Sequence, residues 1–217
     1  MTDLWITAAL AGIIIILGLL FLAARRLGRR RYRPYADDYD VDSVRLKDID
    51  RMEDGSAFEM YLYRLFLELG YDEVYKTTGS RDYGADLVFT DREGIRNVVQ
   101  AKRYAEDHPV GIGAVQEVYS CMRYYNARKA IVIASSTYTA SCETLAGINH
   151  VKLLDRGDLA QMIADFRAGR PEAVMNRIEA EPRLILASWN EATGGDAQGA
   201  IRKDYKAEEY AQRLARK

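Results

Sequence analysis

Two apolar runs joined by a short polar turn constrain the fold of this chain more than any other feature. Residues 87–89 form the first run and residues 98–99 the second, and the polar turn between them ends at Gly94. A segment bounded by Gly79 and Gly84 leads into the first run. Short apolar runs separated by a turn that contains glycine predict a β-hairpin. A three-residue loop that places Gly94 at a positive φ angle then predicts the register of the two strands.

In that register Asp86 faces Gln100 across the strand pair, and Lys102 lies two residues further along the second strand. Residues opposite one another share a face of a sheet, and so do residues two apart. A hard cation such as Mg²⁺ binds carboxylate and other oxygens and activates a water. A neighbouring lysine stabilises phosphate charge or helps to deprotonate that water. Either charged residue alone would be ordinary at a strand end, but the three together predict metal-assisted phosphodiester hydrolysis.

The Gly-Ala-Asp motif ending at Asp86 and the Gln-Ala-Lys motif from Gln100 to Lys102 resemble the catalytic core of Mrr-like restriction endonucleases. These enzymes belong to the PD-(D/E)xK nuclease superfamily, and the likeness keeps its order over residues 52–165. The resemblance implies DNA cleavage that depends on Mg²⁺, with Mn²⁺ as a substitute. It implies that Asp86 is the metal carboxylate and Lys102 the catalytic lysine. Gln100 stands where most of the superfamily has an acid, and we expect it to be a metal ligand and part of the catalytic set.

Glu59 has two competing interpretations. It follows Ser56 by three residues, which is the spacing of a capping box at the start of a helix that Gly70 ends. The family resemblance suggests instead that an acid in the first helix reaches the metal. A neutral Gln100 supplies less charge than an acid, so a second carboxylate would help to hold the cation. Both interpretations stay open at this stage.

Four further residues are candidates for DNA contact. Gln116 lies in a helix predicted over residues 113–125, at a point where the Mrr-like pattern has a polar residue. Arg103 could hold a phosphate without reading sequence. Ser135 and Ser136 begin a hydroxyl-rich segment before the next helix; hydroxyls there are expected to cap the helix, although they could also contact phosphate.

The elements expected along the chain follow the order α-β-β-β-α-β-α-β-α. Residues 130–134 show no polar alternation, so this strand should be buried on both faces. A three-strand meander followed by alternating strands and helices predicts an α/β fold with a mixed sheet of about five strands and helices on both faces. This restriction-endonuclease-like domain should span residues 55–168, followed by a helical extension over residues 169–217. Within the 113–125 helix, the residues expected to face inward are Val115, Val118, Tyr119 and Met122.

Residues 4–24 are apolar and uncharged. At about 1.5 Å per residue they span roughly 31 Å, enough to cross the hydrocarbon core of a membrane. Six arginines follow between residues 25 and 33, which predicts a single-pass anchor over residues 1–33 with its C-terminal side in the cytoplasm. A cleaved signal peptide would carry its basic residues before the apolar run. Residues 34–54 are acidic and are expected to form a solvated linker.

The formal net charge of −1 does not indicate nucleic-acid binding, so any DNA surface must be a local basic patch. Cys121 and Cys142 do not form a metal-type cluster and are expected to be reduced packing residues. The sequence therefore predicts a DNA endonuclease anchored in the cell inner membrane, with its nuclease domain in the cytoplasm. The alternative is a weakly active or inactive nuclease fold that serves as a membrane-tethered DNA-binding or assembly protein. Self-association is also left open.

Overall fold

Five strands form one mixed sheet in the computed structural model, which describes residues 40–78 and 83–184 together with positions 206, 209, 212 and 214. The strands lie in the order β1-β2-β3-β4-β5, with the first three antiparallel and the last three parallel. The elements in chain order are α2 (Leu46–Asp50), α3 (Gly55–Leu69), β1 (Asp72–Lys76), β2 (Leu87–Thr90), β3 (Arg96–Lys102), α4 (Gly113–Cys121), β4 (Lys129–Ala134), α5 (Ala140–Asn149), β5 (Val151–Leu154), α6 (Arg156–Arg167) and α7 (Pro171–Glu179).

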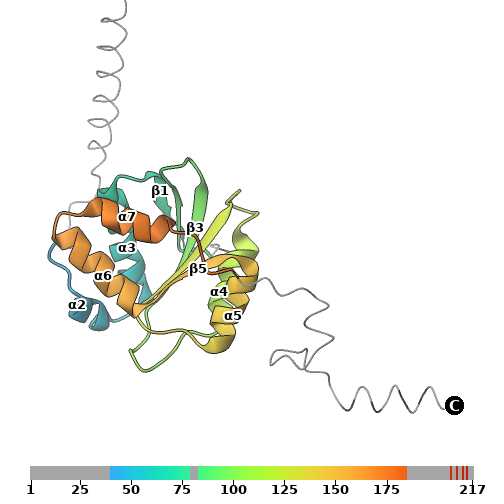
Figure 1. The fold of residues 1–217 in the computed structure, drawn as a ribbon. Coiled ribbons are helices and arrows are strands. Elements are labelled where there is room, and N and C mark those ends of the chain that lie inside the picture. Colours follow the sequence, from blue (N-terminus) through green and yellow to red (C-terminus); the bar gives the residue numbers. More distant parts are fainter. Residues whose placement is uncertain are drawn as a thin grey trace, which may run out of the picture.

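Helices cover both faces of the sheet (Figure 1). The first face packs against α2, α3, α6 and α7, and the second against α4 and α5. Strand β4 is buried on both sides, because Ile131 and Ile133 belong to the first core cluster whereas Val132 belongs to the second. The predicted mixed five-stranded sheet with flanking helices is therefore confirmed.

The β2–β3 hairpin has the predicted register. Gly94 adopts a φ of 79°, and the Asp91 N–H donates to the Ile95 carbonyl at 2.9 Å. The Asp91 side chain completes the turn, because its carboxylate accepts hydrogen bonds from the backbone N–H of Ile95 and from the side chains of Asn97 and Lys129. The turn therefore fixes which residues of the two strands face one another.

Residues 40–54 do not form the solvated linker that their acidity suggests. Val41, Val44, Ile49 and Met52 are buried in the first core cluster, so the linker prediction is wrong for this part of the chain. The helical extension predicted from residue 169 begins with α7, but this helix also belongs to the core rather than to a separate extension. Its buried contributions are Val174, Met175 and Ile178.

Three sequence predictions lie wholly or largely outside the described residues: the anchor over residues 1–33, most of the glycine-bounded turn at residues 79–82, and the helical extension beyond residue 184. Within the part of the chain that the structure describes, no helix has the length and apolar character needed to cross a membrane. Helix α4 is shorter than predicted, since it ends at Cys121. Its Val115 and Val118 face inward as expected, but Tyr119 is 48% exposed, so the inward placement of Tyr119 is wrong.

The hairpin turn yields a first prediction. Burial would raise the pKa of Asp91, but hydrogen bonds from Ile95, Asn97 and Lys129 outweigh it and hold that pKa below its ordinary value. Asp91→Asn should lower the free energy of unfolding at pH 7 by about 1–3 kcal/mol, because the variant loses part of this network. A carboxylate whose folded pKa is depressed stabilises the fold above its unfolded pKa and loses that contribution as pH falls through the folded value.

Urea denaturation of wild type and Asp91→Asn at neutral and acidic pH measures this effect. The difference between the two proteins should be largest at pH 7 and should shrink once the pH falls below about 4. A difference that stayed constant down to pH 3 would show that the charge of Asp91 contributes nothing to the turn.

Candidate active site

Asp86 immediately precedes β2, and its backbone and side chain are both fixed. Its N–H donates to the Val99 carbonyl at 2.8 Å, and its own carbonyl accepts from the Thr77 N–H at 2.9 Å. The side chain is buried, and Oδ2 accepts hydrogen bonds from the Gln100 amide and, at 2.7 Å, from the Ala101 N–H. Strand β3 therefore holds the carboxylate, while β3 and Thr77, the residue after β1, hold the backbone of Asp86.

Lys102 ends β3 on the same face of the sheet as Gln100. Val99 and Ala101 pack into the cluster beneath α3, so the alternating residues Gln100 and Lys102 face α4. The ammonium of Lys102 pairs with Glu117 of α4, with Nζ and Oε2 2.6 Å apart. The structure thus brings Asp86, Gln100 and Lys102 to one face at the carboxyl end of β3.

Glu117 is a residue of this site that the sequence pattern does not reveal. The pattern favours its neighbour Gln116, but Gln116 is exposed and Glu117 is the residue that contacts Lys102. The inward positions Val115 and Val118 leave residues 116 and 117 on opposite flanks of the helix. The periodicity therefore could not show which flank faces the end of β3.

Gly84 joins the turn before Asp86 to helix α4. It has a φ of +99°, and a Cβ built there would lie 2.5 Å from the Glu117 carbonyl oxygen. Glycine is the residue that allows both this backbone angle and this close approach. Glu117 therefore touches both sides of the site: its backbone meets the turn that carries Asp86, and its side chain meets Lys102.

Glu59 does not close a capping box. The N-cap of α3 is Asp54, whose Oδ1 accepts from the Ala57 N–H at 3.1 Å, so the prediction that Ser56 caps this helix is wrong. The Glu59 carboxylate instead pairs with Lys76 of β1 at 2.7 Å. Helix α3 covers the face of the sheet opposite α4, so Glu59 approaches from the other side. Its role as a metal ligand stays a prediction.

Ser135 and Ser136 are fully buried and face no solvent from which a phosphate could approach. The Ser135 hydroxyl accepts from the Tyr104 N–H and donates to the Tyr104 carbonyl, at 2.9 and 2.7 Å. It therefore fixes the segment that follows Lys102, and the DNA contact expected of these two serines does not fit this arrangement. The pKa of Asp50 is lowered chiefly by its hydrogen bond from Arg156, and the positive charge of Arg103 adds to this effect.

The oxygen donors at this site fit a hard divalent cation. Magnesium sites commonly use one or two carboxylates, with waters and substrate phosphates as the other ligands. Asp86 supplies a carboxylate and Gln100 an amide oxygen, and both lie on the α4 face. Among the described residues, no group of three or more His, Cys, Asp or Glu side chains is placed to hold a metal ion.

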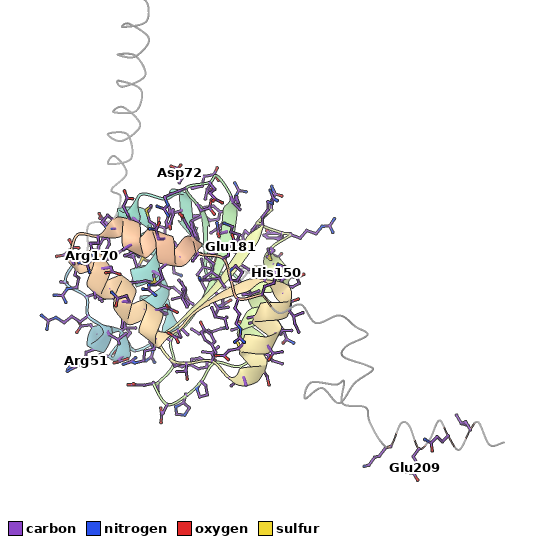
Figure 2. The ribbon with its side chains drawn as sticks, in the orientation of Figure 1. Arg51, Asp72, His150, Arg170, Glu181 and Glu209 are labelled. Atoms are coloured by element: carbon purple, nitrogen blue, oxygen red, sulfur yellow. The ribbon has the colours of Figure 1, made fainter. Side chains whose placement is uncertain are left out.

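A pocket of about 200 Å³ lies at the opposite end of the sheet, where β3, β4 and β5 begin. His150 and Glu181, both labelled in Figure 2, line it together with Lys129 and Lys152. Lys129 is engaged by Asp91 and Glu93. The pocket is therefore separate from the cluster around Asp86.

The contact between Asp86 and Gln100 yields a second prediction. Gln100→Glu should lower the free energy of unfolding in EDTA by about 1–3 kcal/mol, because a buried carboxylate loses its donor and gains a like charge. Mg²⁺ should recover this loss, because a ligand that binds the folded state stabilises it. The matched control is Gln100→Met, which removes the amide without adding charge and should not be recovered by Mg²⁺. Thermal melts with and without Mg²⁺ that show no metal effect on Gln100→Glu would contradict a metal site here.

Residues 49–163 match the Mrr catalytic-domain family model, described as restriction endonuclease. Three solved structures are similar to this chain. The DNA modification-dependent restriction endonuclease AspBHI is 16% identical, with a TM-score of 0.44 over 68% of this chain and 44% of its own. The MspJI restriction endonuclease in complex with a 27-mer oligonucleotide is 18% identical, with a TM-score of 0.42 over 83% and 44%. The protein of unknown function AF1548 is 14% identical, with a TM-score of 0.39 over 72% and 76%.

This chain spans less than half the length of AspBHI and of MspJI. No curated protein matches it at a significant level. The family model, in contrast, covers more than half of the 217 residues and includes Asp86, Gln100 and Lys102. The chain therefore belongs to the Mrr catalytic-domain family of restriction endonucleases.

Proposed function

We propose that this chain is a membrane-anchored DNA endonuclease that depends on a divalent metal. One observation carries the proposal: in a chain of the restriction endonuclease family, Asp86, Gln100 and Lys102 meet on one face at the carboxyl end of β3. A carboxylate and an amide oxygen that can bind a cation, next to an ammonium that can bind phosphate, suit hydrolysis of a phosphodiester better than a structural role.

Each residue has a separate task in this chemistry. Mg²⁺, or Mn²⁺ in its place, would neutralise phosphate charge and activate a water when held by Asp86 and Gln100. Lys102 donates hydrogen bonds to a non-bridging phosphate oxygen, on which negative charge accumulates in the transition state. The water oxygen forms a new bond to phosphorus, one bond from phosphorus to a deoxyribose oxygen breaks, and that oxygen leaves with a proton.

Glu117 holds the ammonium of Lys102 before DNA binds. The ion pair joins Nζ and Oε2 at 2.6 Å, while the lysine side chain keeps 20% of its surface exposed. The lysine side chain is a flexible stem of four carbons. A neighbouring carboxylate that already restrains this stem reduces the conformational entropy lost when the ammonium binds phosphate. Glu117 therefore acts as a positioning residue for Lys102 in this proposal.

The division of labour between Asp86 and Lys102 is a third prediction. Asp86→Ala should abolish both cleavage and Mg²⁺ binding, because it removes the charge that attracts the cation. Lys102→Ala should lower the cleavage rate by about 10²-fold or more and keep the metal, because it removes a donor to the phosphate. The matched control is Lys129→Ala, since Lys129 is also a part-buried strand lysine paired with a carboxylate, at the other end of the sheet.

Plasmid nicking with and without Mg²⁺ measures cleavage, and titration calorimetry measures metal binding. Wild type that cuts no DNA under any divalent metal, while still binding DNA, would favour a non-catalytic tethering protein. Asp86→Ala cutting as fast as wild type would contradict the assignment of the site itself.

The membrane anchor is the second part of the proposal and rests on the sequence alone. The apolar run of residues 4–24 and the arginines that follow support it. As a fourth prediction, the full chain should stay in the membrane fraction after a carbonate wash, and a reporter fused after Lys217 should behave as cytoplasmic. Deletion of residues 1–33 is the control and should release the protein. A shortened soluble product of the full chain would show that the segment is a cleaved signal peptide.

A further inference from the structure

Three tyrosines form a stack beside the site. The rings of Tyr83 and Tyr124 lie with centroids 4.3 Å apart and planes at 40°. Tyr125 meets Tyr124 edge-on, with centroids 4.9 Å apart. Tyr125 is partly buried against the second core cluster, whereas Tyr83 and Tyr124 are 57% and 64% exposed. We call these three rings the tyrosine platform: two exposed rings supported by one that is anchored in the core.

Tyr83 is held in the platform by its backbone rather than by burial of its ring. Tyr83 adopts a φ of +50°, in the left-handed region that residues with a side chain seldom occupy. The next residue is Gly84, which packs against the Glu117 backbone of α4. Strained backbone conformations persist where surrounding structure enforces them, and they concentrate at functional sites. The chain thus holds Tyr83 in a costly conformation although its ring gains little burial.

The platform also lies close to the groups assigned to the chemistry. Tyr83 precedes Asp86 by three residues. The Glu117 backbone touches Gly84, and its carboxylate contacts Lys102. A continuous path of contacts therefore runs from the platform to the lysine on the α4 side of the sheet. The exposed rings therefore lie on the α4 side of the sheet, the side that Gln100 and Lys102 also face.

We propose that the tyrosine platform stacks on an unpaired nucleobase of the DNA substrate, an inference that rests on the nuclease function proposed above. In an intact duplex each base face is covered by its neighbours, so an aromatic ring can stack only where a base is unpaired or displaced. Stacking of bases on aromatic rings is strong and tolerates any sequence. The exposed Arg123 precedes Tyr124 and supplies positive charge for the adjoining backbone. The substrate class is therefore DNA with a locally open strand rather than perfect duplex.

Competition binding with the full chain in detergent tests this inference, with Ca²⁺ in place of Mg²⁺ so that binding is measured without cleavage. The probes are three oligonucleotides of equal length: a perfect duplex, a duplex with one unpaired 2-aminopurine, and a single strand. Wild type should bind the two open probes about 5- to 30-fold more tightly than the duplex. The fluorescence of the 2-aminopurine should fall on binding, because stacking on a ring quenches it.

Tyr124→Ala should lose both the preference and the quenching, whereas Tyr124→Phe should keep them because the ring remains. The matched control is Tyr119→Ala. Tyr119 is a similarly exposed tyrosine of α4 and makes no ring contact within the described part of the chain. It lies two residues from Glu117, about 200° around the helix, and its removal should leave the preference unchanged.

Equal binding of open and perfect duplexes by wild type would overturn the inference, as would an unchanged preference in Tyr124→Ala. The rival explanation is that the rings join two copies of the chain. Light scattering on the same samples tests it, because a smaller particle for Tyr124→Ala than for wild type would show self-association through the rings and overturn the inference. Plasmid cleavage separates the two proposals. Cleavage without a preference for open DNA refutes the platform alone, whereas absence of both binding and cleavage refutes the nuclease function and the platform with it.

Discussion

The contact between the Asp86 carboxylate and β3 is the interaction on which the geometry of the candidate active site depends. A buried carboxylate is costly unless it accepts hydrogen bonds, and Asp86 receives two at one oxygen, from Gln100 and from the backbone of Ala101. These bonds require the register that the Gly94 turn sets at the far end of the hairpin. The turn therefore controls the geometry of the site, because a slip of one residue in the pairing of β2 and β3 would move Gln100 to the opposite face of the sheet.

The amide at position 100 has a physical consequence for the buried carboxylate of Asp86. Two carboxylates at this distance would repel each other, and one would take up a proton until a cation arrived. A glutamine instead donates to Asp86 and satisfies the buried carboxylate without adding a second negative charge. In the proposed function, an amide in place of an acid leaves substrate phosphate a larger share of the cation's ligands.

Much of the fold could be predicted because local rules decide it. The hairpin register follows from the position of Gly94, and burial of β4 follows from its lack of polar alternation. The linker prediction failed for residues 40–54 because acidic residues dominate the composition of this segment. Its few apolar residues are too widely spaced to form a pattern that indicates burial. Val41 and Ile49 pack against the core, a contact that no local pattern in the sequence reports.

The site was predictable only where residues share a strand pair. Asp86, Gln100 and Lys102 met as expected, because the period of two in a strand fixes their face. Glu117 and the tyrosine platform depend on how α4 crosses the sheet, and that crossing is set by packing between distant elements. Ser135 was misjudged for a related reason: its hydroxyl pairs with the backbone of Tyr104, 31 residues earlier in the chain.

A crystal of the protein grown with Mn²⁺ and measured at the manganese absorption edge would test the central claim most directly. The account predicts one anomalous peak in contact with the Asp86 carboxylate and the Gln100 amide oxygen, on the α4 face and within reach of Lys102. The same peak should be absent from Asp86→Ala crystals grown under identical conditions. A peak elsewhere on the chain, or none at a concentration that supports DNA cleavage, would contradict the assignment of Asp86 and Gln100 as the metal site.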